Sequence, residues 1–165
     1  MPAGIIPLAI ISDTHLPPAS MVGNPIRAAL IGFPTIEAGG KCVSEIIASG
    51  IIPAGMEMMD KALIHATDNF VKAGYPRDAE SMLIVELDGT ETEVEELIEK
   101  VSNIAKRNKS SSIKISKNEK QRLKFWAGRK AAFPACGDMA PDYYCMDGTI
   151  PVSYTHLTLP TTPYV

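Results

Sequence analysis

Cysteine and histidine are scarce in this chain, and their scarcity removes several classes of protein. The 165 residues include three cysteines, Cys42, Cys136 and Cys145, and three scattered histidines. An odd number of widely spaced cysteines does not form the framework of a disulfide-rich secreted domain, and without a C-x-x-C pair a structural zinc site is disfavoured. The cysteine content therefore predicts a protein of the reducing cytoplasm.

Long apolar runs and a strong excess of charge are also missing. The apolar stretch at the N-terminus is interrupted by Pro7, Asp13 and His15 and has no positively charged segment before it. These features predict neither a transmembrane segment nor a secretory signal peptide. The net charge of −3 and the pI near 5.6 argue against a nucleic-acid partner, which calls for a basic surface. The basic residues between Lys106 and Lys130 are interpreted as helix ends and a solvated helix face.

Short catalytic motifs are equally rare. The sequence has no G-x-G-x-x-G fingerprint, no P-loop and no G-x-S-x-G elbow. The stretch LAIISDTHLP resembles the first metal-binding motif of calcineurin-like metallophosphoesterases, but two metal ions need further ligands. Gly137-Asp138 lacks the second aspartate of the next motif, and Asn24 is followed by Pro25 where a histidine is expected. A metallophosphoesterase is therefore the third of three hypotheses.

The sequence does contain a regular alternation of strand and helix patterns between Arg27 and Phe133. Apolar runs predict strands at AALIGF and SMLIVELDGTE, the alternating SSIKIS predicts an edge strand, and IIPAGMEMM predicts a strand broken by Pro53 and Gly55. An amphipathic stretch after each strand predicts a helix. The predicted fold class is α+β, with a ferredoxin-like alternation of strands and helices and a mostly antiparallel sheet covered by helices.

Capping residues and apolar spacing predict the helix starts and the buried helix faces. Thr35 can begin the first helix because its hydroxyl accepts an unpaired backbone N–H, and capping-box patterns begin two later helices, Thr90 with Glu93 and Ser116 with Glu119. The residues predicted to face the core are Ile36, Gly40, Val43 and Ile47 in the first helix, Leu63, Thr67, Phe70 and Val71 in the second, and Val94, Leu97, Ile98, Val101 and Ile104 in the third.

Three long blocks carry a family resemblance. SEIIASGIIPAGMEMMD, AGYPRDAESMLIVELDG and FWAGRKAAFPACGDMAPDYYCMDGTIP occur in this order between residues 27 and 151. Together they resemble the C-terminal domain of FAD-linked oxidases of the glycolate oxidase and D-lactate dehydrogenase group, within the vanillyl-alcohol oxidase type superfamily. The resemblance covers about three quarters of the chain.

The resemblance implies a two-domain flavoenzyme. A separate N-terminal domain would bind FAD, and the chain would be the α+β cap over the flavin. The implied reaction oxidises a small 2-hydroxy acid, glycolate or D-lactate, to the 2-oxo acid with hydride transfer to the flavin. The implied partners are other subunits of a glycolate oxidase complex, through which a cytoplasmic protein would lie at the periphery of the inner membrane.

Arg129 is the residue best suited to a substrate anion. Its guanidinium is always charged and can bind a carboxylate through two parallel hydrogen bonds, but the residues alone leave it undecided between a surface charge and an anion ligand. The resemblance favours the ligand, because Trp126 and Arg129 keep the W-x-x-R pattern of the family, and it adds Lys130 as a lesser substrate contact. Glu57 is a lesser cofactor contact on the flavin side, beside Asp60, whose expected role is a helix cap.

Beyond this helix the resemblance assigns less. Tyr143, Tyr144 and Asp147 lie where the family chain runs into its next strand, and Cys145 stands where related 2-hydroxyacid dehydrogenases often have a lysine. The second polar contact to the substrate is therefore not assigned.

The two ends of the chain do not follow the family pattern. Residues 1–26 are expected to be an irregular, non-native start, and residues 152–165 begin with VSYTHL, which resembles a translated transposase-adapter end, and are expected to be an artefactual tail. Residues 27–151 are then a truncated cap domain without a Gly-rich FAD-pyrophosphate loop or an H-x-G-D-G-N block, inactive alone. The alternative hypothesis is a small non-catalytic α+β ligand-binding or assembly module.

Overall fold

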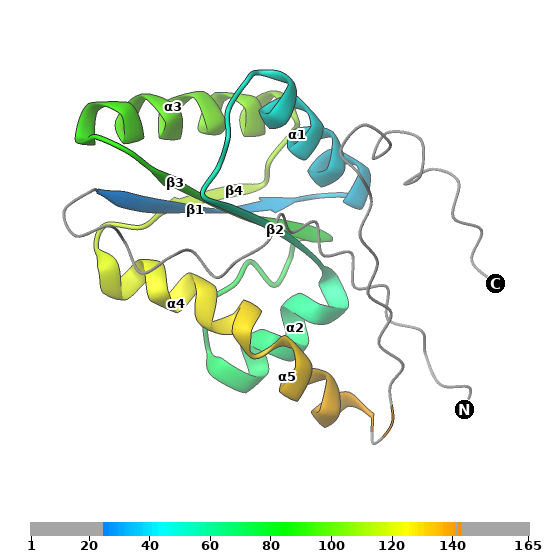
Figure 1. The fold of residues 1–165 in the computed structure, drawn as a ribbon. Coiled ribbons are helices and arrows are strands. Elements are labelled where there is room, and N and C mark those ends of the chain that lie inside the picture. Colours follow the sequence, from blue (N-terminus) through cyan, green and yellow to red (C-terminus); the bar gives the residue numbers. More distant parts are fainter. Residues whose placement is uncertain (1–24, 141, 143–165) are drawn as a thin grey trace.

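The structure is a computed structural model that describes residues 25–140 and 142. Strands and helices alternate along the chain as predicted (Figure 1). The strands are β1 (Ile26–Phe33), β2 (Gly55–Asp60), β3 (Ser81–Asp88) and β4 (Ser112–Ile115). The helices of the described residues are α1 (Ile36–Ala48), α2 (Lys61–Val71), α3 (Glu91–Arg107), α4 (Glu119–Lys130) and α5 (Ala132–Met139).

The four strands form one antiparallel sheet in the order β2-β3-β1-β4. The central strands β1 and β3 are buried along nearly their whole length, which is why their sequences are continuous apolar runs rather than alternating ones. β4 is short, half-buried and at an edge, as the alternation in SSIKIS predicts. The sheet therefore places its most apolar strands where both faces are covered.

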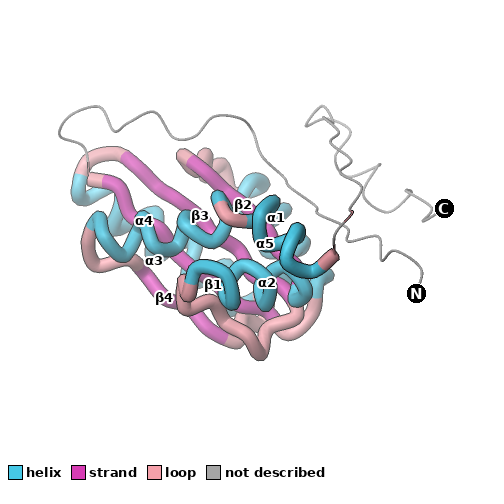
Figure 2. Tube along the Cα trace, turned by 90° about the horizontal axis from the view of Figure 1, so that it is seen from below, coloured by secondary structure: helices cyan, strands magenta, loops and turns pink. Residues whose placement is uncertain are grey.

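Helices cover both faces of this sheet (Figure 1). α1 and α3 pack on one face, and α2, α4 and α5 pack on the other, where they lie across the strands when the molecule is viewed from that side (Figure 2). The units β1-α1-β2 and β3-α3-β4 with both helices on one face form the ferredoxin-like arrangement. The α+β class with an antiparallel, helix-covered sheet is thus confirmed, and the second helical layer is an addition to it.

Two separate cores lie on the two faces because successive strand residues point to opposite sides. On β3, Leu83, Val85 and Leu87 belong to the core under α1 and α3, whereas Met82 and Ile84 belong to the core under α2, α4 and α5. The next residue in this second series is not apolar. It is Glu86, which is fully buried.

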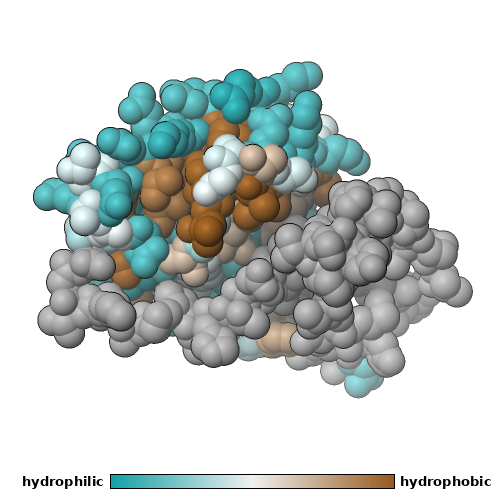
Figure 3. All heavy atoms as spheres, turned by 45° about the horizontal axis from the view of Figure 1, so that its top comes forward, coloured by the Kyte–Doolittle hydropathy of each residue, from teal (hydrophilic) through white to brown (hydrophobic). Residues whose placement is uncertain are grey.

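The buried face of α1 differs from the predicted one. Gly39, Cys42, Val43 and Ile46 face the core, while Ile36 and Ile47 are 53% and 46% exposed. The helix turns Gly39 inward because it approaches the sheet closely there, where a Cβ atom would come within 2.7 Å of Ser81 Oγ. Ile36 and Ile47, which lie outside the core, add apolar surface to the layer of α1 and α3. Figure 3 shows hydrophobic residues gathered between hydrophilic ones on this face of the molecule.

Of the other predicted details, the caps of α1 and α3 are confirmed and one core residue of α2 is wrong. Thr35 accepts from Ala38 N at the start of α1, and the capping box of Thr90 and Glu93 is present at the start of α3. In α2, however, Phe70 is 46% exposed.

The start of the fourth helix and the second strand also differ from prediction. Asn118 caps α4, not Ser116, because the Ser116 hydroxyl is used by the sheet, where it accepts from Ala28 N. β2 begins at Gly55 rather than being broken there.

Candidate functional site

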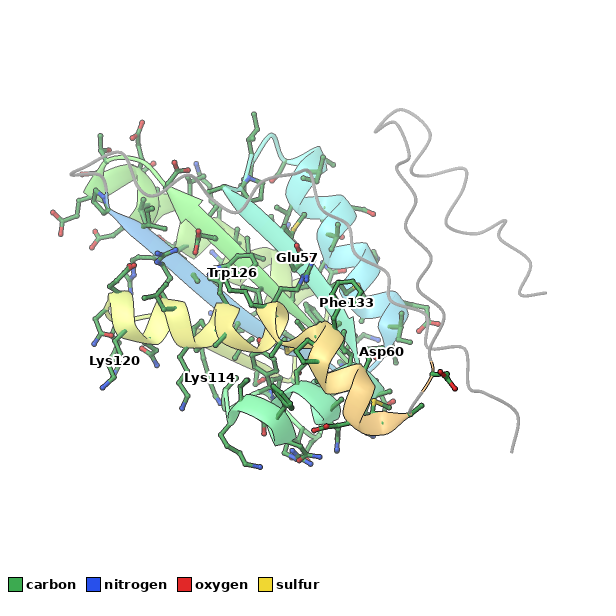
Figure 4. The ribbon with its side chains drawn as sticks, turned by 60° about the horizontal axis from the view of Figure 1, so that its bottom comes forward. Glu57, Asp60, Lys114, Lys120, Trp126 and Phe133 are labelled. Carbon is green, nitrogen blue, oxygen red and sulfur yellow. The ribbon has the colours of Figure 1, made fainter. Side chains whose placement is uncertain are left out.

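The inner face of α4 carries polar residues where an ordinary helix would be apolar. Arg122, Trp126 and Arg129 are spaced at i, i+4 and i+7, so they lie on one helical face. That face is turned toward carboxylates on β2 and β3, and Figure 4 shows Trp126 and Glu57 close together between the helix and the sheet. The interface between α4 and the sheet is therefore electrostatic as well as apolar.

The first carboxylate, Glu86 on β3, is held by hydrogen bonds to one of its two oxygens, while its buried Oε1 atom has no hydrogen-bond partner. Its Oε2 atom accepts from Arg122 Nη1 at 2.8 Å and from Trp126 Nε1 at 2.6 Å. The same guanidinium donates through Nε and Nη2 to Glu119 at 2.8 and 2.6 Å. The Glu119 hydrogen bonds raise the pKa of Arg122 and, in return, lower the pKa of Glu119. Arg122 is thus used on every nitrogen and has a structural role.

Small residues make room for this buried network. In the strand register, Gly55 of β2 and Ala28 of β1 flank Glu86 on either side. A Cβ atom at Gly55 would come within 3.2 Å of the Trp126 ring. The absence of a side chain at Gly55 therefore lets the indole lie flat enough over β2 and β3 to reach Glu86.

The second carboxylate, Glu57 on β2, is held far less well. Its Oε2 atom lies 3.1 Å from Arg129 Nε, with the two side chains 10% and 22% exposed. Although the atoms are close, their geometry does not form a hydrogen bond, and each is a buried polar atom without a hydrogen-bond partner. Burial raises the pKa of Glu57, and the charge of Arg129 together with its close side-chain approach offsets only part of that rise.

The end of α4 that carries Arg129 is fixed by the loop that follows α2 on the same face of the sheet. The Tyr75 hydroxyl donates to Phe125 O, and a Cβ atom at Gly128 would collide with the Tyr75 ring. Asp68 of α2 holds this loop by accepting from Gly74 N and Tyr75 N at 2.7 and 3.1 Å. Arg129 is therefore presented from a rigid backbone.

The structure brings together two of the three predicted site residues. Arg129 and Glu57, proposed separately from the sequence, are in contact, whereas Lys130 is exposed at the last position of α4. Asp60 caps α2 by accepting from Leu63 N, as expected. Tyr143, Tyr144, Cys145 and Asp147 lie outside the described residues, as do Asp13 and His15.

Sequence reasoning missed Glu86 and Arg122. A signal for Glu86 was present, because it is the one charge within the apolar run SMLIVEL, and a charge inside a doubly buried strand needs a partner. Arg122 could then have been found one helical turn before Trp126.

The described residues offer little for a metal or a whole cofactor. No group of three His, Cys, Asp or Glu side chains among them could hold a metal ion, and none of their helices has the length and apolarity of a membrane span. A surface hollow lined by Asp88, Glu93, Glu96, Leu97 and Lys100 carries three carboxylates, which would repel a pyrophosphate. This hollow therefore does not suit the pyrophosphate of FAD.

This fold and site define an α+β domain that presents an arginine at the end of a helix, against an incompletely paired carboxylate. The family model for FAD linked oxidases, C-terminal domain, matches residues 24–159. The chain therefore belongs to the FAD-linked oxidase C-terminal domain family, and the predicted resemblance is confirmed.

Curated relatives agree with this assignment. The chain is 50% identical over 125 residues to the glycolate oxidase subunit GlcD of Escherichia coli (strain K12), covering 76% of the chain and 25% of that protein. It is 30% identical over 127 residues to GlcD of Bacillus subtilis (strain 168), covering 77% of the chain and 27% of that protein. A probable mitochondrial D-lactate dehydrogenase of Danio rerio is 25% identical over 138 residues, covering 82% and 26%. The chain thus spans about a quarter of the length of these relatives.

A solved structure shows the same fold at low sequence identity. Alkyldihydroxyacetonephosphate synthase matches with a TM-score of 0.50 and 15% identity, covering 72% of this chain and 25% of that one. At this identity the match supports the arrangement of the strands and helices and nothing about the site.

Proposed function

We propose that the chain is the cap part of an FAD-linked oxidoreductase that oxidises a small 2-hydroxy acid, glycolate or D-lactate, to the corresponding 2-oxo acid. The family and the names of the relatives support the reaction class. The observation in the structure that carries the proposal is Arg129, a partly exposed guanidinium on a rigid helix end that makes no side-chain hydrogen bond to a described residue.

Arg129 suits the carboxylate that all these substrates share. A guanidinium binds a carboxylate through two parallel hydrogen bonds, so one residue both attracts and orients the acid. Orientation matters because the C–H bond at the hydroxyl-bearing carbon must face the oxidant within a narrow range of geometries. Lys130, the next residue in the helix, is exposed. We propose that its positive charge attracts the same anion more weakly.

FAD is implied by the family and would accept the two electrons of this oxidation. Because the family is described as a C-terminal domain and the chain spans about a quarter of its relatives, we propose that the cofactor is held mainly by an N-terminal domain of a longer protein, and that this chain covers it. On the same basis, the chain alone is expected to be inactive. Two relatives are subunits of a glycolate oxidase, which supports our proposal that the longer protein associates with other subunits. A location at the periphery of the inner membrane, through those subunits, stays a prediction.

The test is an assay of the full-length, flavin-loaded protein that contains this chain. Glycolate and D-lactate are offered with an artificial electron acceptor to the wild type, to Arg129→Ala and to Lys124→Ala, a control that removes an exposed cation from the same helix. Loss of the carboxylate ligand should cost about 2 to 5 kcal/mol in kcat/KM, roughly 30- to 4000-fold. Arg129→Ala activity equal to that of the control would remove the role assigned to Arg129.

A further inference from the structure

The contact between Arg129 and Glu57 has an unusual quality for a buried ion pair. The two charges are only 3.1 Å apart, yet neither Arg129 Nε nor Glu57 Oε2 has a hydrogen-bond partner, and both atoms are buried. Buried charges are normally satisfied by hydrogen bonds as well as by an opposite charge, because each ion has lost its hydration. Charge attraction, and not a hydrogen bond between Arg129 Nε and Glu57 Oε2, therefore holds the pair together.

The neighbouring pair on the same helix shows what a permanent partner looks like. Arg122, seven residues earlier on the same face, donates from Nε, Nη1 and Nη2 to two carboxylates at 2.6 to 2.8 Å. Arg129 has no such bonds to the described residues, so its terminal nitrogens remain able to receive a planar, two-oxygen ligand. Arg122 therefore has the contacts of a structural residue, whereas Arg129 has the contacts expected of a residue that binds an external anion.

We propose that Glu57 is the resident counter-ion of Arg129, and that the carboxylate of the incoming acid displaces it and leaves Glu57 to take up a proton. This inference rests on the proposed function, since it concerns the same anion. Before binding, Glu57 neutralises Arg129; after binding, the acid's carboxylate does so. One proton from solvent then bonds to a Glu57 carboxylate oxygen, so that for an acid with a single carboxylate the charge of the site is the same before and after.

The surroundings of Glu57 support proton uptake. Arg129 of α4 is the charge that favours its ionised form, while burial opposes that form. The other carboxylate on this sheet face, Glu86 of β3, is already neutralised by Arg122. Ile84, opposite Glu57 in the register, offers no charge or hydrogen bond. When the acid takes over Arg129, nothing else near Glu57 among the described residues compensates a negative charge.

The test uses the full-length, flavin-loaded protein and oxalate, a two-carboxylate acid that has no C–H bond to oxidise. Binding is followed by the change in flavin absorbance between pH 5 and pH 8, and net proton uptake by calorimetry in two buffers of different ionisation enthalpy. The variants are Glu57→Gln and Glu80→Gln, a control that makes the same charge change at an exposed pair with Lys61.

For wild type and Glu80→Gln, we expect uptake approaching one proton, and an affinity that weakens up to about tenfold per pH unit once Glu57 is ionised in the free protein. Glu57→Gln should bind oxalate more tightly at neutral pH, with no proton uptake at this site and a flatter pH profile. Equal pH profiles and equal proton uptake in wild type and Glu57→Gln would overturn the proposal, and so would weaker binding by Glu57→Gln.

Failure of this inference is distinguishable from failure of the proposed function. If oxalate binds, and Arg129→Ala weakens it, but Glu57→Gln changes neither affinity nor proton uptake, the anion site stands and the counter-ion role of Glu57 is wrong. If oxalate binds and Arg129→Ala leaves its affinity unchanged, Arg129 is not the anion ligand, and this inference falls together with the role assigned to Arg129. Should Glu57→Gln not fold, proton uptake by the wild type still decides, because an uptake of zero contradicts the exchange.

Discussion

Two arginines on one face of α4 meet two carboxylates on neighbouring strands, with opposite results. Arg122 and the fully buried Glu86 form a hydrogen-bonded network that includes Trp126 and Glu119. Arg129 and Glu57, at the other end of the helix, are close but make no hydrogen bond to each other. An arginine facing a glutamate therefore has two different roles on this helix. At one end, Arg122 and Glu86 form a structural clamp, by which we mean the hydrogen-bonded network with Trp126 and Glu119; at the other end, Arg129 is an available cation.

The difference lies in the surroundings of each carboxylate. Glu86 is in the interior of β3, where Gly55 and Ala28 leave space for an indole and a guanidinium to close over it. Glu57 is on the edge strand β2, where Arg129 alone approaches it with a charge. Glu86 accepts from an arginine and an indole through Oε2, although its Oε1 has no partner, whereas no hydrogen bond joins Glu57 to Arg129. Hydrogen bonds fix the first pair, and their absence leaves the second open to competition from another anion.

The largest effect is expected from breaking the clamp in the chain itself. Glu86→Ala removes the partner of a buried guanidinium and of the Trp126 N–H, and it should lower the free energy of unfolding by about 3 to 5 kcal/mol. Glu119→Ala removes the exposed partner of the same arginine and should cost about 1 kcal/mol or less. Urea unfolding followed by circular dichroism measures both, and equal losses would contradict the clamp.

A smaller loss is expected from disturbing the helix between the two pairs. Gly128→Ala places a methyl group against the buried Tyr75 ring, so it should destabilise the chain by about 1 to 3 kcal/mol. Gly137→Ala in α5 meets nothing within 4 Å. It should therefore stabilise the chain by up to about 1 kcal/mol, because alanine favours a helix. Thermal unfolding of both variants measures the contrast, and a stabilising Gly128→Ala would be inconsistent with it.

The loose pair should reveal itself through pH. Because the folded-state pKa of Glu57 lies above its ordinary value of 4.5, the native state binds the proton more tightly than the unfolded state. The stability contributed by Glu57 is then complete below pH 4.5 and declines as the pH rises through the folded-state pKa. Glu57→Gln lacks this decline, so its stability relative to wild type should rise between about pH 4 and pH 7. Urea unfolding across this range measures the difference; a constant difference contradicts the prediction.

Asp68 should show the opposite and smallest pH trend, because hydrogen bonds stabilise its ionised form. Burial raises the pKa of Asp68, but hydrogen bonds from Tyr75 N, Gly74 N and Arg77 together outweigh burial and bring the pKa below its ordinary value of 3.8. Its stabilising contribution is present above pH 3.8 and is lost as the pH falls through the lower folded-state pKa. Asp68→Asn should be less stable than wild type at pH 7 by about 1 to 3 kcal/mol, with a smaller gap at pH 3. A gap that widens in acid would contradict this sign.

Much of the fold was predictable from local patterns. The alternation of strands and helices, the strand at SMLIVEL, the edge position of SSIKIS and the caps at Thr35 and Thr90 are all present. The failures occurred where a residue is used by a distant segment. Ser116 does not cap α4 because Ala28 N occupies its hydroxyl, and α1 does not bury Ile36 because close approach to Ser81 turns Gly39 inward.

The candidate site was predictable only in part. The type and position of Arg129 follow from the sequence and its resemblance, although its role as a substrate ligand stays a prediction. Glu86 stands out in the sequence as a charged residue within an apolar strand. Its partner Arg122, however, lies 36 residues further along the chain and in a different element. No local pattern connects the two.

The sequence by itself determined the order of the elements, the family and the presence of two arginines on one face of a helix, because these depend on periodicity and on blocks of neighbouring residues. Only the tertiary structure decided which arginine donates all its hydrogen bonds within the protein and which can still bind an anion. That choice depends on which strand lies beneath each turn of α4 and on how completely its carboxylate is enclosed. Burial and hydrogen-bond geometry, which arise when β2, β3 and α4 pack together, distinguish Arg122 from Arg129.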